Sequence, residues 1–187
     1  LARFGYTDIS ILDGGLAAWA GAGYEVFSGV NVPSKAFGEF IEAEYETPHI
    51  PAAELQAMKD RGEDMVIVDS RPLAEFETMS IPGAIDVPGA ELALRIHDIA
   101  PGPETTVVVN CAGRTRSIIG AQSLINAGIP NRVVALENGT MGWHLAGFEL
   151  EQGAERSFPA VSGNGLARAA ECAGRVGDMF GVPEIDA

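Results

Sequence analysis

Short, continuous apolar runs that alternate with helical patterns constrain the fold of this chain more than any other feature. Met65–Asp69, Thr105–Asn110 and Arg132–Leu136 carry apolar residues at consecutive positions rather than at every second position. Such runs are typical of strands that are buried on both faces. Helical patterns are expected between and around them, at Ala52–Arg61, Leu73–Met79, Glu91–Ile96, Ser117–Ala127 and around Trp143, and a further short strand at Ala84–Val87. We therefore expect an α/β fold, with a central parallel sheet flanked by helices on both faces.

Cys111 occupies a position in this pattern that suits a nucleophile. It directly follows the Thr105–Asn110 run and stands on a short turn before the helix that we expect to start near Ser117. Unpaired backbone N–H groups and the helix dipole favour negative charge at such a place. Arg114 and Arg116 add positive charge within five residues, so the pattern predicts a reactive thiolate.

A second polar segment, Asp69-Ser70-Arg71, closes the Met65–Asp69 run. In a parallel α/β sheet, ligands bind beyond the carboxyl ends of the strands. Because both segments stand at such ends, we expect Cys111 and Asp69 to converge on one edge of the sheet. The prediction is a site made of a thiolate and an anion-accepting loop.

Charge and cysteine content exclude several classes of function. The net charge of −14 argues against binding of nucleic acid, which needs a basic surface. No apolar run approaches the roughly 20 residues that span a bilayer, and no secretory segment is visible. We therefore expect no membrane association. The two cysteines, Cys111 and Cys172, form neither a disulfide framework nor a metal-ligand pattern. We expect them to be free thiols in a cytoplasmic protein that needs no metal or other cofactor. Cys172 is interpreted as a structural residue of a helix without a cationic neighbour.

The chain contains an internal repeat with an offset of 124 residues. The segment that starts at Leu12-Asp13-Gly14-Gly15 and contains Trp19 aligns with the segment that starts at Leu136-Glu137-Asn138-Gly139 and contains Trp143. A repeat of this length is too long for a solenoid unit. We expect residues 1–30 to be the C-terminal tail of a preceding domain in a tandem array.

Three further segments follow from composition. Residues 31–50 contain Pro33, Pro48 and an acidic stretch, and we expect a linker whose acidic residues are solvated and bind nothing. Residues 51–153 are expected to form one complete domain. Residues 154–187 are expected to contain a helix that connects towards a following domain, with an apolar face that packs on its own domain or mediates association.

Several motifs together resemble the rhodanese family of sulfurtransferases. They are Val66-Ile67-Val68-Asp69-Ser70-Arg71-Pro72, the Glu75-Phe76 pair, Ile81-Pro82-Gly83-Ala84-Ile85-Asp86-Val87-Pro88, the Cys111 loop and the closing segment around Trp143. The resemblance covers residues 50–151 as a full domain and residues 1–30 as a truncated one. Each motif alone is common, but their order and spacing are specific to the family.

The resemblance implies that Cys111 is the catalytic residue of a two-step sulfur transfer. Its thiolate takes the outer sulfur of a small anionic donor such as thiosulfate, mercaptopyruvate or a persulfide, and a thiol or cyanide then accepts that sulfur. The loop would wrap the persulfide and bind substrate through Ala112, Gly113, Arg114, Thr115, Arg116 and Ser117. Asp69 and Arg71 are expected to form a supporting ion pair. Arg95 either pairs with Glu91 on a helix surface or faces the pocket. Neighbouring rhodanese-like domains are the expected protein partners.

Two departures from the family pattern and two alternatives remain open. Arg114 stands where many members have Gly, and Ser80 stands where His is common, so loop side chains bear on the choice of donor. A cysteine phosphatase or arsenate reductase on the same sheet would place its oxyanion-binding Arg where this chain has Ser117, one residue after Arg116. A persulfide carrier or interaction module without enzymatic turnover is the other alternative.

Overall fold

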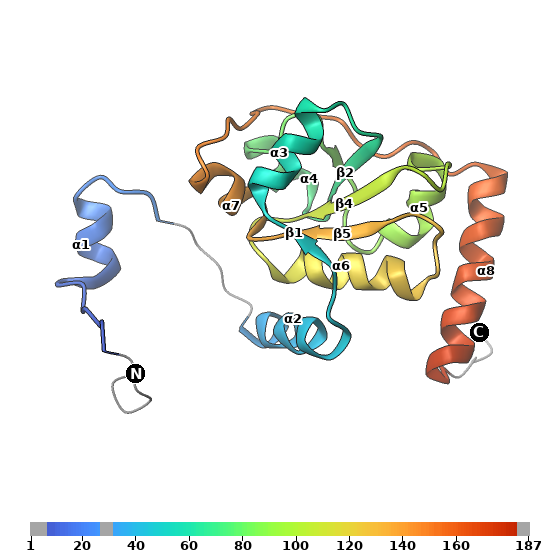
Figure 1. The fold of residues 1–187 in the computed structure, drawn as a ribbon, viewed down its shortest axis with the longest axis horizontal. Helices are drawn as coiled ribbons and strands as arrows, with labels where there is room; N and C mark the ends of the chain where they lie inside the picture. The colour runs from blue at the N-terminus through green and yellow to red at the C-terminus, as the bar shows by residue number, and fades with distance from the viewer. Residues whose placement is uncertain (1–6, 27–31, 183–187) are drawn as a thin grey trace. The chain divides into compact units, whose positions relative to one another are not determined.

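The computed structural model describes residues 7–26 and 32–182. The chain divides into two units, Leu1–Val32 and Pro33–Ala187. The larger unit contains a five-stranded sheet in the order β1-β5-β4-β2-β3 (Figure 1). Its strands are β1 (His49–Ile50), β2 (Met65–Asp69), β3 (Ile85–Asp86), β4 (Thr106–Asn110) and β5 (Val133–Leu136). All neighbouring strands run parallel, which confirms the predicted α/β fold.

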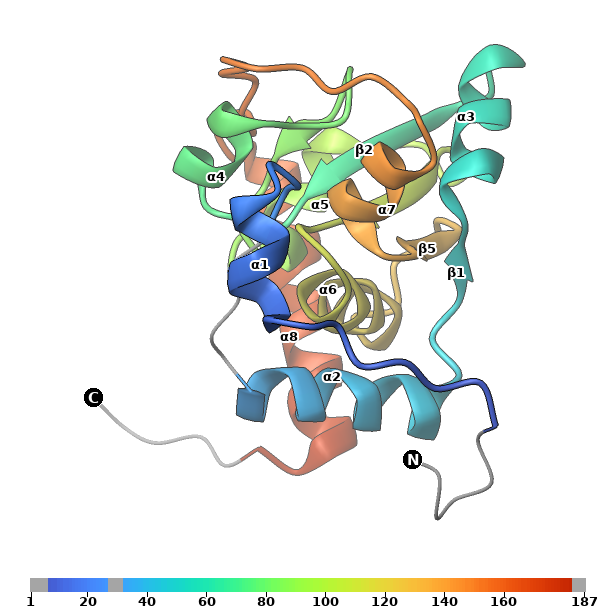
Figure 2. The ribbon, with the colours of Figure 1, turned by 90° about the vertical axis from the view of Figure 1, so that its left-hand side faces the viewer.

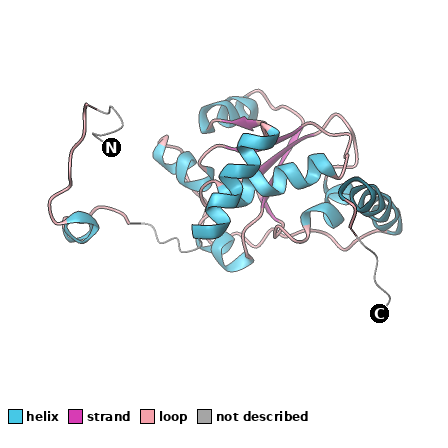
Figure 3. Ribbon diagram, turned by 90° about the horizontal axis from the view of Figure 1, so that it is seen from below, coloured by secondary structure: helices cyan, strands magenta, loops and turns pink. Residues whose placement is uncertain are grey.

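Helices cover both faces of the sheet (Figures 1 and 3). The helices of residues 32–182 are α2 (Val32–Tyr45), α3 (Ala52–Asp60), α4 (Leu73–Thr78), α5 (Leu92–Ile99), α6 (Thr115–Asn126), α7 (Gly139–Leu145) and α8 (Gly163–Phe180). Val108 of the central strand packs in a core cluster with Leu55 of α3 and Trp143 of α7. Val107 and Val109 point to the other face and pack with residues of α5 and α6. Two cores of this kind bury β4 completely, which is why its sequence shows no polar alternation.

The segment expected to be a linker contains regular structure. The helix α2 occupies most of residues 31–50, and β1 pairs with β5 at the edge of the sheet. Pro33 does not break α2, because it is the second helical residue, where a missing N–H costs no hydrogen bond. The sheet thus begins at His49, just before the expected domain boundary. Figure 2 shows α2 running below α6.

The helix α8 packs on other helices of the larger unit. Its N-cap residue Ser162 bonds through its backbone N–H (3.0 Å) and its hydroxyl (2.5 Å) to the carboxylate of Asp98, close to the C-terminal end of α5. Arg175 donates to the carbonyl of Ala127 at 2.8 Å. These bonds hold α8 against α5 and the end of α6, and its connection towards a further domain stays a prediction. Among the described residues, none of the helices combines the length and apolar character needed to cross a bilayer.

The smaller unit contains α1 (Gly15–Gly21), and its local structure matches that of α7. Trp19 Nε1 donates to the carbonyl of Glu25 at 3.0 Å, and Trp143 Nε1 donates to the carbonyl of Glu149 at 2.8 Å. Both helices follow a residue in the left-handed region, Gly14 in one copy and Asn138 in the other. The repeat seen in the sequence is therefore also a repeat of conformation, while the assignment of residues 1–30 to a preceding domain stays a prediction.

Candidate active site

Two neighbouring strand ends bring the predicted site residues together. In the parallel pair of β2 and β4, Asp69 is in register with Asn110, so both strands end at the same edge of the sheet. Ser70 ties the two ends together, because its backbone N–H and its hydroxyl donate to the carbonyl of Asn110 at 2.9 and 2.8 Å. The predicted convergence of Cys111 with Asp69 is thus confirmed.

Cys111 begins a tight loop and is almost fully buried, with 2% of its surface exposed. Its Sγ lies 3.5 Å from Ser117 Oγ, and the Ser117 hydroxyl donates to the carbonyl of Arg114 at 2.8 Å. Since that hydroxyl proton is already used, the Ser117 oxygen is oriented to accept from the thiol. The helix α6 starts earlier than expected, at Thr115, so Arg114 is the N-cap residue and Ser117 lies in the first turn.

The first turn of α7 holds the carbonyl side of this loop. The N–H groups of Thr140 and Met141 donate to the carbonyls of Cys111 (2.8 Å) and Ala112 (3.0 Å). Gly139 permits this approach, because a Cβ there would lie 2.3 Å from the Cys111 oxygen. Among the described residues, the N–H groups of residues 112–117 donate to no protein acceptor. The loop therefore presents uncommitted N–H donors near the sulfur, as a site for developing negative charge requires.

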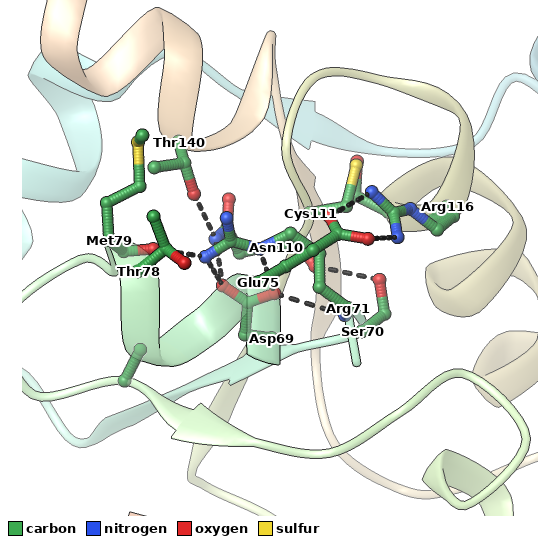
Figure 4. A network of polar contacts seen from close by, with 12 residues as sticks. Asp69, Ser70, Arg71, Glu75, Thr78, Met79, Asn110, Cys111, Arg116 and Thr140 are labelled. Carbon is green, nitrogen blue, oxygen red and sulfur yellow. Dashed lines mark hydrogen bonds and ion pairs between the residues drawn. The ribbon is translucent and has the colours of Figure 1, made fainter. Parts of the chain in front are cut away.

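The two loop arginines are held by carboxylates from elsewhere in the fold. Arg114 Nε lies 2.7 Å from Glu39 Oε1 on α2, and its Nη2 also bonds to Glu42. Arg116 makes a bidentate bond to Glu75 on α4, with distances of 2.9 and 2.8 Å (Figure 4). This pairing is the main cause that raises the pKa of Arg116, with a smaller contribution from Cys111, and it lowers the pKa of the Glu75 carboxyl. The role of both arginines in binding an anionic donor stays a prediction.

Asp69 and Arg71 form a buried, bidentate ion pair beside the loop. The guanidinium Nε and Nη2 atoms lie 2.8 Å from Asp69 Oδ1 and Oδ2, and Nη2 also donates to the carbonyl of Met79 at 2.7 Å. Asn110 Nδ2 donates to Asp69 at 2.7 Å and to the Thr140 hydroxyl at 2.9 Å (Figure 4). These bonds link the ends of β2 and β4 with α7, which is the geometry of a supporting pair.

Asp86 is a buried group of this region that was not singled out from the sequence. It ends β3 next to Asp69, and only 1% of its surface is exposed. Burial, and secondly the charge of Asp69, raise the pKa of Asp86 to about 6. Its place in the Ile-Pro-Gly-Ala-Ile-Asp motif was the available signal, but only the fold places it beside a second carboxylate.

Arg95 is held by a neighbour on its own helix, α5, and by a ring that follows β5 and α7 in the chain. Its Nε is 2.8 Å from Glu91 on the same helix, and its guanidinium stacks 4.4 Å from the ring centroid of Phe158. Of the two roles considered for Arg95, the structure contains the helix-surface pair.

The expectation that Cys172 lacks a cationic neighbour is wrong. Arg175 Nη2 lies 3.1 Å from its Sγ, and His97 Nε2 lies 3.6 Å from it. Arg175 follows Cys172 by three residues on α8 and therefore faces the same side of the helix. That signal was present in the sequence, whereas the approach of His97 depends on the packing of α8 on α5.

No group of three or more His, Cys, Asp or Glu side chains in the described part of the chain is arranged to hold a metal ion.

Comparison with known proteins finds one family and several relatives. Residues 51–146 match the family model of the rhodanese-like domain. A crystal structure of a thiosulfate sulfurtransferase from Pseudomonas aeruginosa is 57% identical, with a TM-score of 0.82, and the match covers 99% of this chain and 35% of that one.

Two curated proteins are also similar. An HTH-type transcriptional regulator of Mycobacterium tuberculosis is 33% identical over 105 residues, which are 56% of this chain and 45% of the regulator. A putative sulfur carrier protein of Bacillus subtilis is 25% identical over 136 residues, which are 68% of this chain and 72% of the carrier. The chain thus spans less than half the length of two of these three relatives.

Proposed function

Because the chain belongs to the rhodanese-like domain family, we propose that it is a sulfurtransferase that carries sulfane sulfur as a persulfide on Cys111. The observation that carries the proposal is the geometry of the Cys111 loop. A buried sulfur at a strand end faces a first helical turn whose N–H groups have no protein acceptor in the described part of the chain. Such a cradle suits a small sulfur anion without further side-chain chemistry.

The proposed reaction has two nucleophilic displacements. The Cys111 thiolate attacks the outer sulfur of the donor, a new S–S bond forms, and the bond between the two donor sulfurs breaks. With thiosulfate, the leaving group is sulfite, which departs with the bonding electron pair. An acceptor thiolate or cyanide then attacks the terminal sulfur of the Cys111 persulfide and releases the Cys111 thiolate.

The residues of the site have different proposed roles in this cycle. The N–H groups of residues 112–117 stabilise the negative charge of the persulfide. The Ser117 oxygen accepts a hydrogen bond from the Cys111 thiol before the thiolate forms. Asp69 and Arg71 fix the strand ends that position the loop. We further infer a reducing compartment such as the cytoplasm, where Cys111 and Cys172 stay free, and neighbouring rhodanese-like domains as partners in a longer chain.

Intact mass after donor treatment tests the proposal directly. Incubation with thiosulfate should add one sulfur atom to the wild-type chain, and cyanide should then remove it as thiocyanate. Cys111→Ser should gain no sulfur, whereas Cys172→Ser, the matched control, should gain it as the wild type does. A wild-type mass that stays unchanged with thiosulfate, with an organic thiosulfonate and with a persulfide donor would overturn the proposal.

A persulfide carrier without turnover is the second candidate, and the similarity to the putative sulfur carrier of Bacillus subtilis favours it. A carrier should take one sulfur per chain and release it only slowly to small thiols, whereas an enzyme should form thiocyanate continuously. The phosphatase alternative predicts hydrolysis of an aryl phosphate. The loop sequence argues against it, because the position at which such enzymes carry their oxyanion-binding Arg is occupied here by Ser117.

A further inference from the structure

The acidic stretch of residues 39–46 reaches the reacting loop, although its sequence suggested a solvated face. Glu39 and Glu42 stand three residues apart on α2 and therefore on one side of the helix. Both carboxylates bind the guanidinium of Arg114. Glu42 is also mostly shielded from solvent, with 17% of its side chain exposed, and lies 3.6 Å from His49.

Close packing fixes α2 in this position. A Cβ at Gly38 would lie 2.7 Å from the methyl group of Thr115 and 3.2 Å from its Cα. The helix α2 therefore touches the first residue of α6, four residues after Cys111. The pairing of Glu39 and Glu42 with Arg114 is thus part of a packed contact between two helices.

The charge balance of the Cys111 loop follows from these pairs and from the bond of Arg116 to Glu75. Arg114 and Arg116 supply two positive charges, and Glu39, Glu42 and Glu75 supply three negative charges in direct contact with them. The arginines are therefore more than neutralised before any substrate arrives. A doubly charged donor meets much less attraction here than the sequence, with two arginines beside the cysteine, suggests.

We propose that Glu39 and Glu42 are specificity-determining residues that direct the site towards singly charged sulfane donors, such as organic thiosulfonates and persulfides, and away from the thiosulfate dianion. This inference rests on the proposed function. The two glutamates act through Arg114 and are positioning residues. They set how much of its positive charge a donor experiences.

The two donor types undergo the same chemistry with different charges. The Cys111 thiolate attacks the sulfane sulfur, the S–S bond of the donor breaks, and the leaving group takes the electron pair. An alkanethiosulfonate with one negative charge releases a sulfinate with one charge, and thiosulfate releases sulfite with two charges. Methanethiosulfonate and thiosulfate are therefore matched probes that differ mainly by one unit of charge on the leaving group.

The measured quantity is the ratio of kcat/KM for thiosulfate to kcat/KM for methanethiosulfonate, with cyanide as the common acceptor. In the double variant Glu39→Gln/Glu42→Gln, we expect this ratio to rise about fivefold at low salt, the order expected for two carboxylates acting on one extra substrate charge. In Arg114→Gln the ratio should fall instead, because the carboxylates remain without their cation. High salt should reduce both changes.

The chain offers a matched control for the double variant. Arg61 is also held by two carboxylates, Glu54 at 3.0 Å and Glu63 at 2.6 Å. The Arg61 cluster precedes the start of β2, whereas Cys111 follows the end of β4, which runs parallel to β2. The cluster and Cys111 therefore lie at opposite ends of these strands. Glu54→Gln/Glu63→Gln therefore changes the net charge equally, and we expect it to leave the donor ratio unchanged.

The outcomes separate this inference from the proposed function. Sulfur loading of Cys111 by both donors with an equal ratio in wild type and Glu39→Gln/Glu42→Gln would overturn the inference and leave the sulfurtransferase intact. An equal rise in the Glu54→Gln/Glu63→Gln control would also overturn it, because overall charge would then explain the effect. Loading by neither donor would overturn the proposed function itself. Because a ratio is compared, a partial loss of folded protein affects both donors equally.

Discussion

Replacement of Asp86 by Asn should stabilise the protein at pH 8 and leave its stability nearly unchanged at pH 4. Asp86 is buried beside Asp69, and its Oδ1 has no hydrogen-bond partner in the described part of the chain. Burial first and the Asp69 charge second raise its pKa from 3.8 to about 6, although Arg71 opposes this rise. At about 1.4 kcal/mol per pH unit, this difference corresponds to about 3 kcal/mol of folding free energy.

The sign follows from proton binding. Between pH 4 and 6 the folded protein keeps the Asp86 proton, whereas the unfolded chain has lost it, so the folded state binds more protons. Stability therefore falls as the pH rises through this window, and the loss is complete above the folded-state pKa. An amide cannot ionise and avoids the loss, so the variant should gain up to about 3 kcal/mol over the wild type at pH 8.

Urea unfolding at pH 4, 5, 6 and 8, followed by the fluorescence of the buried Trp143, measures this gain. Glu104→Gln, which removes an exposed carboxylate before β4, controls for the change in net charge. A difference between Asp86→Asn and wild type that is the same at pH 4 and pH 8 would refute the reasoning, since only ionisation of Asp86 makes it depend on pH.

Three further predictions concern the groups that support the loop. Arg71→Met should cost about 3–5 kcal/mol in urea unfolding, because it leaves the buried Asp69 carboxylate without its cation; a cost below about 1 kcal/mol would contradict the pair's role. Gly139→Ala should lower the rate of sulfur transfer more than tenfold, because its Cβ meets the Cys111 carbonyl at 2.3 Å, whereas Gly147→Ala, which has a positive φ but open space, should keep the rate within about twofold. Thr140→Val should cost about 1 kcal/mol in thermal unfolding through the lost Asn110 bond; an unchanged Tm would show that this bond is not stabilising.

The sheet and the position of Cys111 could be predicted because local sequence determines them. Val107, Val108 and Val109 are apolar at consecutive positions. Such a run is typical of a strand that is buried between two layers of helices. Once the strands are parallel, their carboxyl ends must share an edge, and Cys111 meets Asp69 there. This inference needed only the order of strands and polar residues.

The partners of the loop arginines could not be predicted in this way. Glu42 is separated from Arg114 by 72 residues, and Glu75 from Arg116 by 41. In sequence, a helix face whose carboxylates bind a partner looks the same as one whose carboxylates face solvent, because both place carboxylates three or four residues apart. Only packing of α2 against α6 decides between them, and Gly38, the residue that permits it, resembles an ordinary break in a linker.

The helices α1 and α7, the two copies of the repeat, show which features of this segment depend on its local sequence and which depend on the active site. The helix α1 forms the left-handed turn and the Trp19–Glu25 hydrogen bond although none of its residues is buried, so the local sequence suffices for this conformation. A Cβ at Gly15 would meet nothing within 4 Å, whereas one at Gly139 would collide with the Cys111 loop. Glycine is therefore required at position 15 by its φ alone, and at position 139 by its φ and by the carbonyl oxygen that it approaches. The second requirement comes from the site, since the approach of α7 fixes the loop carbonyls and leaves the N–H groups of residues 112–117 for the sulfur.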